Sequence, residues 1–177
     1  QLREKYCNTI SFYNRALKVK ALCHAYHVLL IINDRIDIAL AVGADGVHIG
    51  QTDMPYSKAR ELLGTTKIIG LSVSNEDQAI EAENLKVDYI GISPIFNTAT
   101  KKSDLAPSLG IEGLKMIRPL FSKPIICIGG INRSNVAEII KNGANGVAVI
   151  SAISKAKYPE KETKNLKKVI CQTGLIQ

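Results

Sequence analysis

The sequence has no tryptophan, 5% aromatic residues and four cysteines among 177 residues. Without tryptophan, and without aromatic residues interleaved in a basic stripe, it lacks the platforms on which single-stranded nucleic acids stack. The cysteines lie far apart, with no CxxC pair and no histidine at zinc spacing, which favours reduced thiols. No apolar run approaches the roughly 20 residues of a membrane helix, and no signal peptide is present. We therefore expect a cytoplasmic protein that binds neither nucleic acid nor membrane.

The net charge of +7 is concentrated near the C-terminus. Residues 155–168 hold six lysines and two glutamates, which gives +4 of that total. We interpret this segment as a solvated helix face. The remaining positive charge suits small anionic ligands better than a nucleic acid.

Strand-like and helix-like segments alternate along the chain. Strands are predicted at 29–32, 46–49, 67–71, 88–92, 124–128 and 146–150, and helices at 8–26, 36–42, 55–63, 75–85, 111–120, 132–142 and 159–170. Residues 1–5 read as the end of one more strand. This alternation predicts a parallel α/β sheet. The similar segments GADGV (43–47) and GANGV (143–147) both join a helix to a strand, with a glycine suited to ending the helix.

The count of strands favours a TIM (β/α)8 barrel that is N-terminally incomplete. Such barrels typically need about 200–250 residues. We predict one barrel domain over residues 1–177 that lacks its first strand and helix and most of its second strand. The alternative, a doubly wound sheet, needs a switch point and a glycine-rich loop after its first strand, and neither is visible.

Two aspartates follow consecutive predicted strands. Active sites of (β/α)8 barrels lie at the carboxyl ends of the strands, and Asp34 and Asp53 both fall there. Mg2+ binds through one or two carboxylates, with water and phosphate oxygens completing its shell. The pair therefore predicts a magnesium site. The alternatives are that Asp34 pairs with Arg35 and that Asp53 caps the helix after it.

Cations and glycines at the same edge predict phosphate binding. Arg3, Lys5 and Lys101 suit a diphosphate, because arginine offers a planar fork and lysine a point charge. Gly129-Gly130 and Ile150-Ser151 follow the last two strands, where barrels commonly bind phosphate.

The longest loop, residues 93–109, carries Thr98, Thr100 and Lys101 and reads as a ligand clamp, since long loops in compact domains are usually functional. His48 lies within a strand and is predicted to be structural. No Ser-His-Asp or Cys-His set is evident, which disfavours covalent hydrolysis.

Six segments occur together in the order typical of one family: QLREK (1–5), LLIINDRIDIALAVGADGVHIGQTDMP (29–55), KIIGLSVS (67–74), DYIGISPIFNTATK (88–101), PIICIGGIN (124–132) and GANGVAVISAI (143–153). The chain thereby resembles the thiamine-phosphate synthases up to about residue 153. The resemblance implies an Mg2+-dependent transferase. It would couple 4-amino-5-hydroxymethyl-2-methylpyrimidine diphosphate with 4-methyl-5-(2-phosphoethyl)thiazole, giving thiamine phosphate and diphosphate by dissociative loss of diphosphate.

The resemblance also implies roles for individual residues. Asp34 and Asp53 would bind Mg2+, while Arg3, Lys5, Ser72 and Lys101 would be the catalytic residues. The pyrimidine diphosphate would contact Gln1, Leu2, Arg3, Glu4, Lys5, Asn33, Ser72 and Lys101. The thiazole phosphate would contact Thr98, Thr100, Gly130, Ile150 and Ser151.

Two other functions stay open at this point. A thiazole tautomerase-like paralogue would carry a catalytic histidine where this chain has Ser74, and would tend to lose the metal aspartates. A non-catalytic phosphate-binding barrel is disfavoured because Asp34, Asp53 and the three cations occur together. The expected partners are the two phosphorylated small molecules, and the sequence is also compatible with a homo-oligomer.

Overall fold

The computed structural model describes residues 1–97 and 107–174. The chain folds into two compact units, Gln1–Ser72 and Val73–Gln177, and each is described by itself. We call them unit 1 and unit 2. Residues 98–106 of the predicted clamp loop, with Thr98, Thr100 and Lys101, lie outside the described residues.

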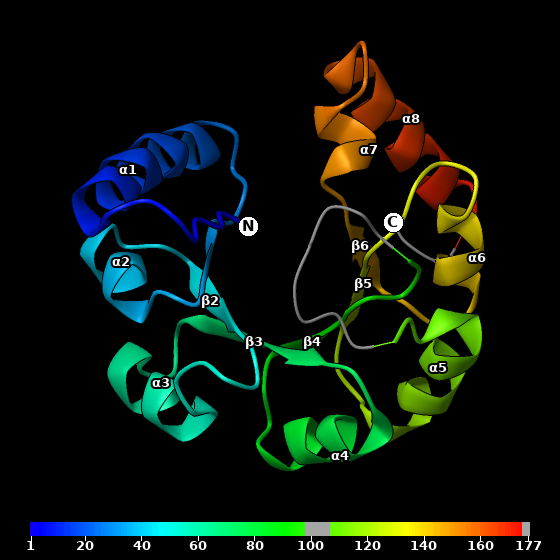
Figure 1. The fold of residues 1–177 in the computed structure, drawn as a ribbon, viewed down its shortest axis with the longest axis horizontal. Helices are drawn as coiled ribbons and strands as arrows, with labels where there is room; N and C mark the ends of the chain where they lie inside the picture. Colours follow the sequence, from blue (N-terminus) through cyan, green and yellow to red (C-terminus); the bar gives the residue numbers. More distant parts are fainter. Residues whose placement is uncertain (98–106, 175–177) are drawn as a thin grey trace. The chain divides into compact units, whose positions relative to one another are not determined.

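Unit 1 is built of alternating helices and parallel strands (Figure 1). Its elements are α1 (Thr9–Ala25), β1 (Ile31–Asn33), α2 (Ile36–Ala41), β2 (Gly46–Ile49), α3 (Tyr56–Leu63) and β3 (Ile68–Val73), whose last residue enters unit 2. β2 pairs in parallel with β1 and with β3. Leu2 forms a parallel bridge to Ile32 at the free side of β1, as expected for the end of a further strand.

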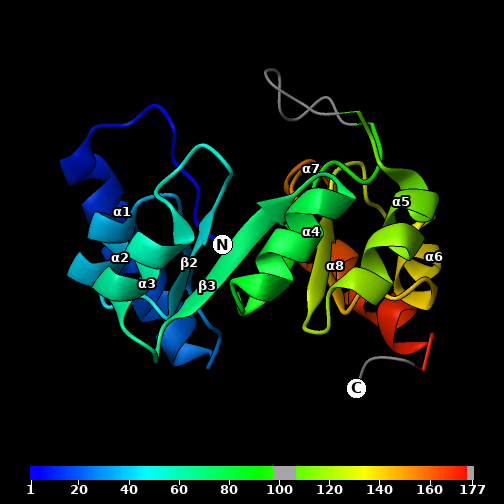
Figure 2. The ribbon, with the colours of Figure 1, turned by 90° about the horizontal axis from the view of Figure 1, so that it is seen from below.

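The helices of unit 1 cover one side of its strands (Figure 2). α2 packs on β1 and β2, and it also contacts α1 and α3. Phe12 of α1, Ile32 of β1 and Val47 of β2 are at most 1% exposed. Burying an apolar side chain of this size contributes about 1.5–3 kcal/mol, so this layer holds the strand ends in place.

Unit 2 repeats the same alternation. Its elements are α4 (Glu76–Asn84), β4 (Tyr89–Ile92), α5 (Gly110–Ile117), the 3-10 helix η1 (Arg118–Leu120), β5 (Ile125–Ile128), α6 (Val136–Lys141), β6 (Gly146–Ala148), α7 (Ser151–Ser154) and α8 (Pro159–Cys171). β5 pairs in parallel with β4 and with β6. Neighbouring strands are thus consecutive in sequence within each unit. The described strands of neither unit show the switch point that a doubly wound sheet requires.

The predicted alternation of helices and strands is confirmed, with corrections at element ends. β3 continues to Val73 rather than ending at residue 71, and β6 ends at Ala148 rather than residue 150. The first strand begins at Ile31 rather than residue 29, and Leu29 is 62% exposed. α6 begins at Val136 rather than Asn132, because Asn132 and Asn135 side chains accept backbone N–H groups of this turn and compete with the helix. The (β/α)8 barrel architecture and the single-domain organisation stay predictions.

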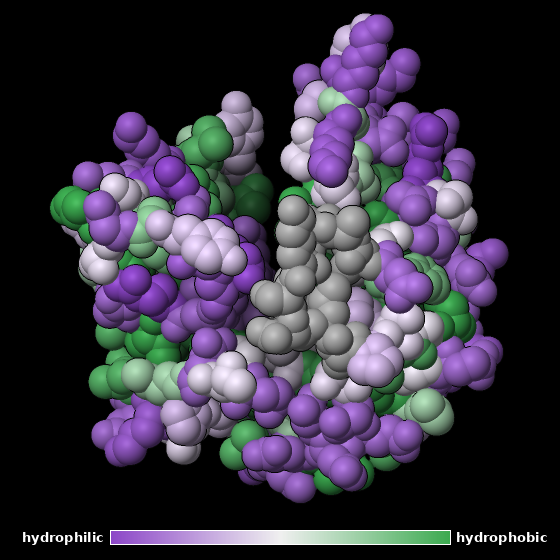
Figure 3. Space-filling model, viewed as in Figure 1, coloured by the Kyte–Doolittle hydropathy of each residue, from purple (hydrophilic) through white to green (hydrophobic). Residues whose placement is uncertain are grey.

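The basic C-terminal segment forms α8 and the turn before it, and all six of its lysines are exposed. Leu166 is the one buried residue recorded for α8. Figure 3 shows a largely hydrophilic surface over α7 and the start of α8. The prediction of a solvated helix face is confirmed. In the described part of the chain, no helix has the length and apolar character needed to cross a membrane.

The two similar segments at 43–47 and 143–147 perform the same structural task. Asp45 Oδ2 accepts a hydrogen bond from the Leu30 N–H at 2.7 Å, and Asn145 Oδ1 accepts one from the Ile125 N–H at 2.9 Å. Each side chain therefore ties the turn before one strand to the start of the preceding strand. A cation completes each joint: Lys20 lies 2.9 Å from Asp45, and Arg118 lies 3.0 Å from Asn145.

Asp45 stays ionised in this position. Burial alone would raise its pKa, but the Leu30 N–H and Lys20 outweigh burial and hold the pKa of Asp45 below its ordinary value. The acceptor side chain of this joint is therefore charged in unit 1 (Asp45) and neutral in unit 2 (Asn145).

Asp45→Ala should lower the free energy of unfolding by about 1–3 kcal/mol, because it leaves the Leu30 N–H without its acceptor. Asp45→Asn should recover most of this loss, since an asparagine does the same task at position 145. Urea unfolding of the three proteins measures both effects. Equal losses in the two variants would show that the charge, rather than the backbone hydrogen bond, stabilises the joint.

Candidate functional site

Asp34 is held in an unusual backbone conformation at the carboxyl end of β1. Its φ is +64°, in the left-handed region that costs a non-glycine residue about 1 kcal/mol. Its N–H donates to the His48 carbonyl of β2 at 2.9 Å. The Asn33 amide donates to Asp34 Oδ1 and, at 3.2 Å, to the same His48 carbonyl. Backbone and side chain thus both fix the carboxylate at this strand end.

The second oxygen of Asp34, Oδ2, forms an ion pair with Lys5. The Asp34 side chain is 14% exposed and the Lys5 side chain 39%. Arg35 instead binds Asp37, at 2.6 and 2.9 Å, and Thr9 at 3.1 Å. The alternative that Asp34 pairs with Arg35 is therefore wrong. The structure brings together the predicted metal ligand and a predicted diphosphate-binding cation.

Asp53 lies just beyond the end of β2. Its Oδ2 accepts a hydrogen bond from the Gly50 N–H at 2.6 Å, which folds the carboxylate back toward the strand end. α3 begins after Pro55, with no side-chain hydrogen bond at its cap. The alternative that Asp53 caps this helix is therefore wrong.

The two carboxylates are anchored at the same edge of the unit 1 sheet. Asn33 is aligned with His48 in the β1–β2 register, so Asp34 and Gly50 follow these strands at matching ends. In the part of the chain that the structure describes, no group of three or more histidine, cysteine or acidic residues could hold a metal ion. Two anchored carboxylates fit a hard cation that completes its shell with water and substrate oxygens, as Mg2+ does.

Ser72 and His48 form a polar pair within this apolar sheet. His48 Nε2 lies 2.9 Å from Ser72 Oγ, and Gln51 donates to the Ser72 carbonyl at 2.7 Å. The prediction that His48 is structural is confirmed, since it is 8% exposed and supports Ser72. Its part in positioning Ser72 was missed. A polar residue in an apolar strand, aligned with Gly70 of the next strand, was the signal that could have shown it.

Burial makes His48 a neutral side chain near neutral pH. It lowers the pKa of His48 to about 4, against an opposing effect of the Asp53 charge. In the unfolded chain the pKa is about 6.5, so the unfolded state binds the additional proton between these values. Stability is therefore complete above pH 6.5 and is lost as the pH falls toward 4.

His48→Gln should lose less stability than the unchanged protein when the pH falls from 6.5 to 5. At about 1.4 kcal/mol per pH unit, His48 accounts for about 2 kcal/mol over this range. Urea unfolding at the two pH values measures the difference. His24→Gln, at an exposed position of α1, is the matched control for the loss of a histidine. The same slope in all three proteins would contradict the assignment.

The N-terminal segment joins this edge through backbone pairing. Leu2 donates to the Ile31 carbonyl at 2.9 Å and accepts from the Asn33 N–H at 3.0 Å. Gln1 and Arg3, on either side of Leu2, are exposed. Glu4 forms an ion pair with Arg15 of α1 and so anchors the segment to that helix.

The predicted phosphate-binding residues of unit 2 lie after β5 and β6. Gly130 has a φ of +63°, and a Cβ there would lie 2.7 Å from the Asn97 carbonyl oxygen and 2.8 Å from Phe96 Cβ. Ile150 is 54% exposed and precedes α7, which Ser151 begins. A short helix thus follows β6 directly. Gly130 is thus required by the close approach of the loop that begins after β4.

Gly130→Ala should destabilise the protein by about 2 kcal/mol or more, because overpacking adds to the cost of the positive φ. Gly43→Ala is the matched control: its φ is +62°, but nothing lies within 4 Å of the added Cβ. Its cost should be about 1 kcal/mol. Thermal unfolding compares the two variants. Equal losses would show that crowding at Gly130 is unimportant.

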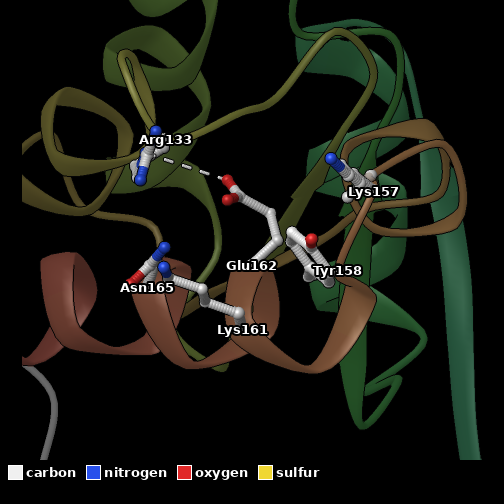
Figure 4. A pocket seen from close by; sticks show the side chains of 7 residues that line it. Arg133, Lys157, Tyr158, Lys161, Glu162 and Asn165 are labelled. Atoms are coloured by element: carbon white, nitrogen blue, oxygen red, sulfur yellow. Dashed lines mark ion pairs between the residues drawn. The ribbon is translucent and has the colours of Figure 1, made fainter.

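A separate cavity of about 260 Å³ in unit 2 lies between Arg133, in the turn before α6, and the start of α8 (Figure 4). It is lined by Arg133, Ala156, Lys157, Tyr158, Lys161, Glu162 and Asn165. Glu162 points toward Arg133, 3.8 Å away, and Lys157 lies over the Tyr158 ring. Among the described residues, no predicted site residue lines this cavity.

The fold and the anchored charges define the class of protein: an α/β protein with a charged site at the carboxyl ends of its parallel strands. A family model described as thiamine monophosphate synthase matches residues 1–153. The chain belongs to the thiamine-phosphate synthase family, whose members are transferases.

Individual relatives agree with this assignment. The thiamine-phosphate synthase of Vibrio campbellii is 51% identical over 160 residues, which cover 90% of this chain and 78% of that protein. The thiamine-phosphate synthase of Clostridium acetobutylicum is 51% identical over 88% of this chain and 73% of that protein.

Among solved structures, the thiamine phosphate pyrophosphorylase of Pyrococcus furiosus has a TM-score of 0.89 and 38% identity. The match covers 97% of this chain and 81% of that one. Orotidine 5'-phosphate decarboxylase from Pyrococcus horikoshii, at 17% identity and a TM-score of 0.67 over 89% of this chain and 81% of its own, shares the fold alone.

Proposed function

We propose that this protein couples 4-amino-5-hydroxymethyl-2-methylpyrimidine diphosphate with 4-methyl-5-(2-phosphoethyl)thiazole, with Mg2+ held by Asp34 and Asp53. The observation that carries the proposal is the pair of carboxylates anchored at neighbouring strand ends, with Lys5 on one of them. Membership of the thiamine-phosphate synthase family supplies the substrates. A (β/α)8 barrel architecture is part of the same proposal.

Residues of unit 1 bind the pyrimidine diphosphate. Arg3 and Lys5 carry the positive charge that the leaving diphosphate requires, and the QLREK segment is kept in place by its pairing with β1. Ser72 is oriented by His48 and Gln51, so that it approaches the substrate in one fixed position. Asn33 is held between Asp34 and the His48 carbonyl, next to the proposed metal and substrate positions.

Residues of unit 2 bind the thiazole phosphate. Gly130 lets the backbone after β5 adopt a positive φ, and Ile150 with Ser151 presents the start of α7 after β6. Backbone N–H groups at such positions favour anions. Thr98, Thr100 and Lys101 complete the proposal, from the family resemblance alone.

The chemistry needs charge stabilisation and positioning rather than a strong base. Mg2+ bound at the two aspartates would neutralise charge on the departing diphosphate. Arg3 and Lys5 stabilise the same charge from the protein side. The aminopyrimidine shares the positive charge left on its methylene carbon, and the thiazole nitrogen attacks with its own lone pair. The neutral, buried His48 is consistent with a positioning role.

Asp34→Ala and Asp53→Ala should each lower Mg2+-dependent formation of thiamine phosphate by about a hundredfold or more, as loss of one charge-stabilising group typically does. Product formation from both substrates is the measurement. Asp37→Ala is the control, since Asp37 is 60% exposed and pairs with Arg35 on the same segment. It should keep nearly full activity. Undiminished turnover in both Asp34→Ala and Asp53→Ala would refute the metal assignment.

A further inference from the structure

Both carboxylate oxygens of Asp34 have donors that come from the protein itself. Asn33 donates to Oδ1, and the Lys5 ammonium pairs with Oδ2. A divalent cation bound through this carboxylate needs at least one oxygen lone pair facing it. An oxygen that accepts one hydrogen bond keeps a second lone pair, but a metal ion on Oδ2 would repel the Lys5 ammonium on the same oxygen. The two positive charges therefore compete for this carboxylate.

The two donors differ in how firmly they are held. The Asn33 amide also donates to the His48 carbonyl, and Asn33 belongs to β1, so its side chain is fixed at two points. Lys5 lies three residues beyond the bridge at Leu2, in a bend, and its side chain is 39% exposed. A lysine is a point charge on a flexible four-carbon stem. Lys5 is the donor that can leave.

The neighbouring cation Arg35 already has other partners. Arg35, next to Asp34 in sequence, is bound to both oxygens of Asp37 and to Thr9. The arginine's position on Asp37 is also reflected in the pKa of Asp37, which the hydrogen bond from Arg35 lowers from its ordinary value. If the Lys5 charge is removed, Arg35 therefore does not replace it as the ionic partner of Asp34.

We infer that Lys5 is an exchangeable counter-ion of Asp34: the divalent cation displaces its ammonium from Oδ2, and the freed ammonium binds the substrate diphosphate. This deepens the proposed function and rests on it. The metal and Lys5 compete for one carboxylate, while a diphosphate attracts both. Binding of the diphosphate therefore strengthens binding of the metal, and by linkage the reverse holds equally. The exchange makes the site favour the metal and diphosphate together over the metal alone.

The test measures metal binding without catalysis. Mn2+ stands in for Mg2+, since both suit carboxylate and water ligands. Isothermal titration compares Mn2+ alone with the preformed Mn2+–diphosphate complex. The proteins are the full chain, Lys5→Met, Lys5→Arg and the control Lys58→Met. Lys58 is a 65% exposed lysine of the same unit that also forms a single ion pair, with Glu61.

Lys5→Met should bind Mn2+ alone more tightly by about threefold to fivefold, the value of a partly exposed ion pair that no longer competes. The same variant should bind the Mn2+–diphosphate complex about tenfold more weakly, because a charged hydrogen bond is lost. Lys5→Arg keeps a cation and should stay close to the unchanged protein in Mn2+ affinity. Lys58→Met should change neither affinity.

The opposite signs of the two effects separate exchange from a structural role, which would weaken both affinities or neither. Unchanged or weaker Mn2+ binding by a folded Lys5→Met overturns the exchange and leaves the metal site itself intact. If the protein without any substitution binds no Mn2+, with or without diphosphate, both the metal assignment and the exchange are overturned.

Discussion

The hydrogen bonds that hold Asp34 at the end of β1 are the constraint on which the site depends. The hydrogen bond from the Asp34 N–H to the His48 carbonyl offsets the cost of the left-handed backbone of Asp34. The Asn33 amide bridges that carbonyl to the Asp34 carboxylate. The fold tolerates this local strain because β1 and β2 pack against α2, with Ile32 and Val47 buried. The core of unit 1 thus sets the position of one charged group, which pairs with Lys5 and which we propose also binds the metal.

The two ends of the strands have different tasks. At the helix-to-strand joints, Asp45 and Asn145 use their side chains to close hydrogen bonds on neighbouring strands, which contributes stability. At the opposite ends, Asp34 and Asp53 are held by backbone N–H groups or an amide, and Lys5 is held only by an ion pair. Asp45 and Asn145 are held by structural hydrogen bonds to the backbone. Lys5 is held by an ion pair that a ligand can replace. This division follows the general separation of stability and activity in parallel α/β folds.

Sequence reasoning predicted the alternation of elements well, because apolar runs and glycine turns report directly on buried parallel strands. β2 has the predicted bounds 46–49. It also placed Asp34, Asp53 and Lys5 at strand ends, since position along a strand is local information. What it could not predict is which partner each charge chooses. Arg35 is adjacent to Asp34 in sequence yet binds Asp37, while Lys5 reaches Asp34 across 29 residues. The His48–Ser72 pair was missed for the same reason, since strand register decides it.

We propose that anchored carboxylates and cations promote the release of diphosphate without a protein base when both substrates are bound. The most direct measurement is diphosphate release from the pyrimidine diphosphate, with and without the thiazole phosphate, in Mg2+ and after its removal with a chelator. We expect that the release of diphosphate requires Mg2+. When the thiazole phosphate is present, thiamine phosphate should form in the same amount as diphosphate. Release that continues at the same rate without a divalent cation, or no thiamine phosphate in the complete mixture, would contradict it.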